Sequence, residues 1–419
     1  MAFPGLLFDD GPKAEPTTRA GVDAEVFVQK LGQALHAFGS PAHRLEAALQ
    51  HVSRSLGLEG QFFCSPTAIF ASFGADRVQR TTLFRVDPGD VHLEKLSRLD
   101  ALVQRVVRGD LGLDEASRRV DEIVAATPRY GAILTTLSFA LVSGGAARFF
   151  GGGWREIVAA TVGGLLVGLW SLVAARVPDA GRLFEPVGGM IMAFATATLA
   201  TMMMPMSPQL VTLSGLIVLV PGMTLTVAMT ELATRNLVSG SARLAGAALV
   251  FITIGFGVAL GSQLGVFLYG TGQSAEPVAL PLWTEAVALL AVAFAFTVLF
   301  RARPRDVVWM LVAGVVAIGG ARLGATVLGP ELGALLAAFA VGIAGNAFAR
   351  LCDRPSAIVQ LPGLMLLVPG SIGFRGIASL LEQDVVSGVE SAFAMALVAI
   401  ALVTGLLMAN VFLPPRRAL

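Results

Sequence analysis

Two stretches of this chain, 148 residues apart, are near copies of each other, and each carries a Pro-Gly pair inside a long apolar run. The first runs from Leu213 to Gly222 and the second from Leu361 to Gly370, and the same offset aligns Val238-Ser239-Gly240 with Val386-Ser387-Gly388. Proline cannot donate a backbone hydrogen bond and glycine loosens a helix, so each copy predicts a membrane helix broken near its middle. Paired breaks of this kind indicate the solute site of a transporter.

The composition is typical of a polytopic membrane protein. Of 419 residues, 55% are hydrophobic and only 14% are charged, with a mean hydropathy of +0.74, which excludes an ordinary soluble protein. Residues 1–130 hold 15 of the 30 Lys and Arg, 17 of the 29 Asp and Glu, and all four histidines. The net charge of +1 gives no indication of nucleic-acid binding, and two cysteines, Cys64 and Cys352, cannot form a disulfide framework.

The first third of the chain predicts a small cytosolic α+β domain over residues 23–130, after a disordered tail at residues 1–22. Amphipathic patterns predict helices over 23–38, 41–56, 90–109 and 112–126, and β-branched and aromatic residues predict strands over 60–65, 67–73 and 79–86. His43, His51 and Cys64 show no metal-ligand or catalytic spacing, so we interpret them as surface histidines and a buried strand cysteine. We expect this domain to be regulatory or to form a cytoplasmic vestibule.

From residue 131 onward, ten apolar segments approach the roughly 20 residues that a bilayer core requires. They are 131–149, 157–176, 184–204, 209–234, 243–268, 283–300, 307–328, 331–349, 357–382 and 386–412. The two broken segments are the fourth and the ninth. Because an odd number of crossings, five, separates them, they cross the membrane in opposite directions. The predicted fold is therefore mainly α, with ten transmembrane helices as two inverted five-helix repeats, residues 131–268 and 283–412. A linker at 269–282 joins the repeats, and a cytosolic tail at 413–419 follows them.

Arginine placement predicts the orientation. If the α+β domain is inside, twelve arginines fall in cytoplasmic loops and flanks, against four on the opposite side or within segments. Because cytoplasmic loops carry an excess of basic residues, we expect both termini in the cytoplasm. The short apolar run at residues 2–8 lacks a basic flank, so no cleavable signal peptide is predicted.

The order of these parts resembles the threonine/serine exporter family over roughly residues 23–412. The resemblance rests on Arg85-Val-Asp-Pro-Gly-Asp90 leading into Val91-His-Leu-Glu-Lys-Leu96, on Leu113-Asp-Glu-Ala116, and on ten membrane segments with two Pro-Gly breaks. It implies export of small hydroxyl amino acids across the bacterial inner membrane, coupled to the proton motive force. Relatives with the two halves on separate chains handle dicarboxylates. The implied partners are a small zwitterionic amino acid, protons and the lipid bilayer, and we expect no cofactor.

Ionisable groups within membrane segments are costly, so they are candidates for the functional site. Arg375 follows the second break and would offer a carboxylate two parallel N–H donors, the alternative being an ion pair with Glu382 or Asp384. Glu231 would bind a proton or the substrate ammonium, the alternative being an ion pair with Arg235 four residues later.

Polar groups and the breaks themselves complete the predicted site. The predicted substrate-binding residues are Pro221, Gly222, Thr224, Thr226, Asn346, Gln360, Pro369, Gly370, Ser371 and Arg375, with Glu231 for proton coupling. We interpret Arg322 as a buried or snorkelling structural cation. Solvated segment ends account for Glu185, Glu285, Glu331, Glu382 and Glu390. The Met202–Met206 cluster predicts apolar packing, and no metal site is predicted.

The favoured function is a secondary exporter that works by proton antiport with alternating access. A dicarboxylate exporter of the same fold and a channel are the alternatives. The chain has no GxxxxGK[ST] loop for ATP hydrolysis, and it has neither an HExxH motif nor a histidine in the membrane part, so we do not expect an enzyme. The exact substrate, the coupling ion and a homo-oligomeric state stay open.

Overall fold

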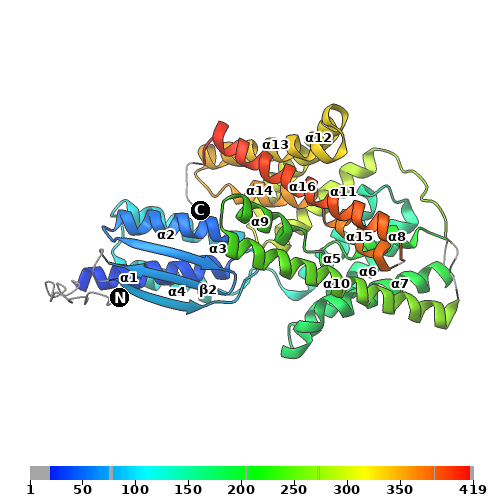
Figure 1. The fold of residues 1–419 in the computed structure, drawn as a ribbon, viewed down its shortest axis with the longest axis horizontal. Coiled ribbons are helices and arrows are strands. Elements are labelled where there is room, and N and C mark those ends of the chain that lie inside the picture. The colour runs from blue at the N-terminus through cyan, green and yellow to red at the C-terminus, as the bar shows by residue number, and fades with distance from the viewer. Residues whose placement is uncertain are drawn as a thin grey trace, which may run out of the picture.

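A computed structural model describes residues 19–74, 79–202, 205–270, 272, 274–381 and 383–415. It is mainly helical. A small α/β unit, made of α1 to α4 and three strands, lies at one end of a bundle of long apolar helices (Figure 1).

The α/β unit contains every helix and strand that the sequence predicts for it. The elements are α1 (Arg19–Ala37), α2 (Ala42–Ser55), β1 (Gly60–Ser65), β2 (Ala68–Phe73), β3 (Arg80–Arg85), α3 (Leu93–Val107) and α4 (Leu113–Ala125). The strands pair antiparallel in the order β1-β2-β3. Apolar residues at helical spacing on α1, such as Phe27, Leu31 and Leu35, are fully buried against Leu45 and Leu49 of α2. Because α1 begins at Arg19, the predicted disordered tail is wrong for residues 19–22, and residues 1–18 lie outside the described part.

The remaining helices form the bundle. They are α5 (Ala132–Phe149), α6 (Trp154–Ala174), α7 (Phe184–Met202), α8 (Pro208–Gly215), α9 (Gly222–Ala233), α10 (Leu237–Tyr269), α11 (Trp283–Leu299), α12 (Val307–Leu328), α13 (Pro330–Cys352), α14 (Ala357–Leu367), α15 (Gly370–Leu381) and α16 (Val385–Phe412), with short 3-10 turns at Pro178–Leu183 and Pro304–Asp306. The described residues hold eight spans long and apolar enough to cross a membrane, and α11 is a shorter apolar helix. The chain is therefore a multi-pass membrane protein.

Both predicted helix breaks are present. The fourth predicted segment divides into α8 and α9, and α9 begins at Gly222 directly after Pro221. The ninth divides into α14 and α15, and α15 begins at Gly370 directly after Pro369. Each half-helix is too short to span a bilayer, since 8 to 12 residues rise by only about 12–18 Å.

The α/β unit is fixed to the bundle through the loop between α11 and α12. The backbone N–H groups of Leu93 and Glu94 donate to the carbonyls of Phe300 and Arg301, at 2.9 and 3.2 Å. The Tyr130 hydroxyl donates to the Ala302 carbonyl at 2.7 Å. These contacts set α3 at the end of the bundle and bring α2 close to α9 and α14.

Candidate functional site

A cavity of about 220 Å³ lies where the α/β unit meets the broken helices. One wall comes from the α1–α2 corner and the segment before α3, and the other comes from α9, the start of α10 and α14. Its lining residues are His36, Gly39, Ser40, Pro41, His43, Arg44, Pro88, Gly89, Val91, Leu96, Met223, Thr224, Thr226, Val227, Thr230, Arg243, Pro355, Ala357, Gln360, Leu361, Leu364 and Leu406. The volume is suited to a small metabolite rather than to a macromolecule.

Beside this cavity, the two Pro-Gly breaks touch each other. A methyl group added at Gly222 would lie 3.6 Å from the Cα of Gly370, and a methyl group added at Gly370 would lie 3.6 Å from the Cα of Gly222. The side chains of Val368 and Val220 close over the crossing, at 1.9 and 2.4 Å from those added methyl groups. Only glycine allows the two backbones to approach in this way.

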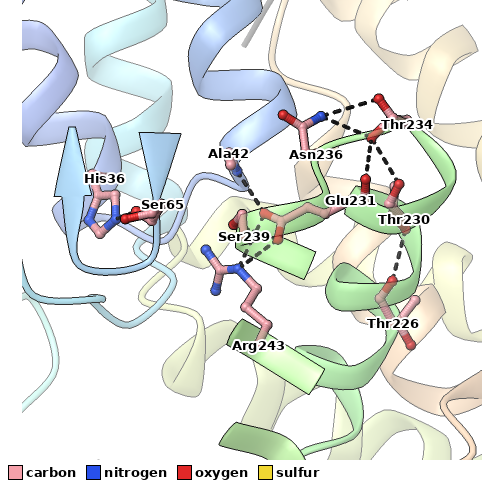
Figure 2. Close-up of polar contacts among 10 residues, drawn as sticks. All are labelled: His36, Ala42, Ser65, Thr226, Thr230, Glu231, Thr234, Asn236, Ser239 and Arg243. Carbon is pink, nitrogen blue, oxygen red and sulfur yellow. Dashed lines mark hydrogen bonds and ion pairs between the residues drawn. The ribbon is translucent and has the colours of Figure 1, made fainter. Parts of the chain in front are cut away.

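Three predicted substrate-binding residues line the cavity: Thr224, Thr226 and Gln360. The side chains of α9 form a ladder in which Thr226 donates its hydroxyl proton to the Gly222 carbonyl at 3.1 Å. Thr230 donates in the same way to the Thr226 carbonyl at 2.8 Å (Figure 2). With their protons used in this way, these hydroxyl oxygens remain as acceptors.

Other predicted residues lie next to the cavity without lining it. Gln360 donates its Nε2 to the Oδ1 of Asn346 at 3.0 Å, and Asn346 in turn donates to Asn410 at 2.9 Å and to the Leu413 carbonyl at 2.8 Å. Asn346 is buried, so it orients the Gln360 amide and does not line the cavity. Pro221, Gly222, Pro369 and Gly370 form the crossing next to the cavity.

The structure does not bring Arg375 or Ser371 to the cavity. Arg375 is exposed on α15, and its described contact is a long one of 3.4 Å to the Ser371 carbonyl of its own helix. Of its two alternative partners, Glu382 lies outside the described residues, whereas Asp384 accepts from the backbone and hydroxyl of Ser387. The predicted carboxylate-binding role of Arg375 therefore finds no support in this geometry.

Glu231 is fully buried at the junction between α9, α10 and the α/β unit. Its carboxylate accepts the Ser239 hydroxyl at 2.7 Å and pairs with Arg243 at 3.1 Å, so its basic partner among the described residues is Arg243 and not the predicted Arg235 (Figure 2). It also accepts the backbone N–H of Ala42 at 2.9 Å. Because Pro41 gives α2 no side-chain cap, Glu231 supplies the missing acceptor from a distant helix.

The predicted site contains none of the four ionisable residues that line the cavity: His36, His43, Arg44 and Arg243. Three of them come from the α/β unit, in which we interpret His43 and His51 from the sequence as surface histidines. That interpretation is wrong for His43, whereas His51 is exposed and Cys64 is buried as expected. Burial first, and then Arg44 and Arg243, lower the pKa of His43 to about 4, so it is neutral at pH 7. An adjacent His-Arg pair in the first turn of an amphipathic helix is too common a pattern to have indicated a site.

A second ionic cluster lies away from the cavity. Glu285 pairs with the buried Arg148 at 3.3 Å and with Arg322. The Arg322 side chain is 64% exposed, so the predicted alternative of a buried cation is wrong. Among the residues that the structure describes, no group of three His, Cys, Asp or Glu side chains could hold a metal ion.

Comparison with known proteins identifies the family. Residues 26–265 match one threonine/serine exporter family model, ThrE, and residues 285–412 match a second, described as "Threonine/Serine exporter, ThrE". The chain belongs to the threonine/serine exporter family. Both family models are described as exporters, and exporters are not a class of enzyme.

Curated relatives of this exporter-family chain include fungal proteins named pheromone-regulated membrane protein 10. The Saccharomyces cerevisiae protein is 29% identical over 379 residues, which cover 87% of this chain and 48% of the relative. The Yarrowia lipolytica protein is 29% identical over 376 residues, covering 84% and 30%. The chain therefore spans about half or less of the length of these relatives. No solved structure matches it.

Proposed function

We propose that this chain is a secondary active transporter that exports small amino acids of the threonine/serine class from the cytoplasm, by proton antiport with alternating access. The observation that carries the proposal is the contact between the two Pro-Gly breaks at Gly222 and Gly370 beside a metabolite-sized cavity. Broken helices that meet within a membrane bundle free backbone groups for a solute, as in inverted-repeat transporters.

The packing pattern supports two inverted repeats of five crossings, with α8–α9 and α14–α15 each counted as one crossing. In the first half, α7 packs on α10 and α5 on α6, and in the second half, α13 packs on α16 and α11 on α12. Across the halves, α8 contacts α15 and α9 contacts α14. The first part of one broken helix thus lies against the second part of the other, which is the arrangement of an antiparallel pair. Such a repeat can exchange two access states of similar energy.

The α9 ladder is suited to an amino acid's ammonium group. The Thr226 and Thr230 oxygens are acceptors on the cavity wall, because their protons are donated to α9 carbonyls. The Gln360 amide, held by Asn346, lies on the opposite helix α14.

Glu231 is the proposed proton-coupling residue. Its carboxylate ties α9 to α10 through Arg243 and ties α9 to α2 through the Ala42 N–H. A proton on this carboxylate would remove the ion pair and weaken the acceptor at Ala42, which would release α2 from the cavity mouth. Proton uptake would thereby favour a state with the cavity open to the α/β side.

We place the α/β unit and both termini in the cytoplasm. The membrane ends that face the α/β unit carry Arg235, Arg243, Arg301, Arg303, Arg305 and Arg354, as the excess of basic residues in cytoplasmic loops predicts. The bacterial inner membrane stays a prediction from the family resemblance.

Counterflow in proteoliposomes tests the proposal. Wild-type protein should exchange threonine and serine saturably, and an imposed pH gradient should drive net transport. Glu231→Gln should keep exchange but lose the response to the pH gradient, whereas Glu390→Gln, at an exposed carboxylate on α16, should behave as wild type. Transport of succinate alone would favour the dicarboxylate alternative, and non-saturable flux without counterflow would indicate a channel. If an imposed pH gradient still drives net transport by the Glu231→Gln variant, the coupling role of Glu231 is wrong.

A further inference from the structure

Arg44, in the first turn of α2, is a partly buried cation without a carboxylate partner among the described residues. Its guanidinium lines the cavity, and its one partner among the described residues is neutral, the Oε1 of Gln360 at 2.8 Å. Partial removal of the guanidinium from water lowers the pKa of Arg44 from its ordinary value. A buried charge costs free energy unless it is paired, so an arrangement of this kind is typical of a site that an anion completes.

The other charged groups around the cavity do not neutralise Arg44. Arg243 is already paired with Glu231 at 3.1 Å, and Glu231 itself is not among the lining residues. Glu46, two residues further along α2, accepts the backbone N–H of Cys64 at 2.7 Å. No Asp or Glu lines the cavity within the described ranges. The cavity therefore has an excess of positive charge that a substrate carboxylate would balance.

His43 supplies a second unsatisfied group on the same helix. Its Nδ1 is buried and has no hydrogen-bond partner within the part of the chain that the structure describes. Buried polar atoms are nearly always paired, so an unpaired one on a cavity wall points to a ligand atom as the missing partner. Because the ring is neutral at pH 7, this nitrogen can donate a hydrogen bond to a ligand hydroxyl or accept one from it, depending on the tautomer. Neither bond adds charge to the cavity.

We propose that the α/β unit is part of the substrate site, with Arg44 binding the carboxylate of the transported solute and the neutral His43 beside it as a hydrogen-bond partner. The solute bridges α2 and α9, with its carboxylate on Arg44 and its ammonium on the Thr226 and Thr230 oxygens. A guanidinium is suited to this task because its parallel N–H groups match a carboxylate. This inference rests on the proposed transport function and adds its recognition element.

The test compares substrates with and without a carboxylate. Full-length protein in proteoliposomes is assayed for counterflow of L-threonine and of L-threoninol, the amino alcohol that lacks the carboxylate. Wild type should prefer threonine, and Arg44→Gln should raise the KM for threonine by about tenfold to a hundredfold, as expected for loss of a charged hydrogen bond, with threoninol unchanged. Arg44→Lys should be intermediate, because it keeps the charge without the planar fork. Arg54→Gln, at an exposed arginine of α2, should match wild type.

The outcomes separate two failures. If wild-type protein exchanges no amino acid, the proposed function fails. If wild type exchanges threonine and Arg44→Gln keeps the same preference over threoninol, the exporter assignment survives and the role of Arg44 is wrong. An equal loss for both substrates would also overturn it, since that result indicates that Arg44 only holds the α/β unit against Gln360. Should Arg44→Gln fail to fold, the threonine preference of Arg44→Lys decides, and an unchanged preference refutes the proposal.

Discussion

The crossing of the two breaks predicts a compensating pair of substitutions. The Cβ of alanine at position 370 would lie 2.4 Å from the Val220 Cγ1, well inside van der Waals contact, and its next neighbours are at 3.6 Å. Overpacking of this kind costs about 1–3 kcal/mol. Val220→Ala alone removes two methyl groups and costs about 1–2 kcal/mol through the space it leaves. Together, the two changes restore ordinary 3.6 Å contacts, so Gly370→Ala in the Val220→Ala background should cost close to nothing.

The measurement is a double-mutant cycle on the thermal unfolding of the purified protein in detergent. Unfolding is monitored as the loss of the monodisperse species. The two substitutions should be non-additive by about 1–3 kcal/mol, so that the double variant is about as stable as Val220→Ala alone. Gly246→Ala on α10 is the matched control, because an added methyl group there meets nothing within 4 Å. If Gly370→Ala is as stable as this control, or if the effects of Gly370→Ala and Val220→Ala are additive, the two breaks do not cross as described.

Three further predictions concern groups outside the crossing. Burial raises the pKa of Cys64 to about 12, so maleimide at pH 8 should modify Cys352 well before Cys64, and equal rates by mass spectrometry would contradict the buried thiol. Arg148→Met should lower stability by about 1.5–3 kcal/mol and Arg322→Met by about 0–1 kcal/mol, because their side chains are 8% and 64% exposed; equal melting shifts would refute this ranking. Burial lowers the pKa of His43 from 6.5 to about 4, so the unfolded chain binds its proton first and stability falls as pH drops from 6.5 towards 4. His43→Gln should flatten this part of the melting-temperature profile, and an unchanged slope would place the effect elsewhere.

The second copy of the repeat lacks the Glu231 contact. At the 148-residue offset, Glu231 corresponds to Ser379 and Arg243 to Ser391. The acid and its basic partner are thus confined to the copy whose end faces the α/β unit. The duplication predicts two similar broken helices. The local difference means that the contact to α2 through a carboxylate that could take up a proton belongs to α9 and has no counterpart at the aligned position of α15.

The local signals in the sequence were sufficient for the elements of this protein. Apolar runs, amphipathic periods and the Pro-Gly pairs report backbone hydrogen bonding within a few residues, and they located the helices, the three strands and both breaks. The same signals cannot report which side chains meet across long stretches of chain. Arg44 reaches Gln360 over 316 residues and the Ala42 N–H reaches Glu231 over 189, and both contacts exist only because the α/β unit docks on α9 and α14. Arg375, which is close to its break in the sequence, lies exposed on α15. The cavity arginine that has no carboxylate partner among the described residues is instead Arg44 of α2. Tertiary packing decided the charge of the site, because the partner of a buried ion is set by proximity in space and not along the chain.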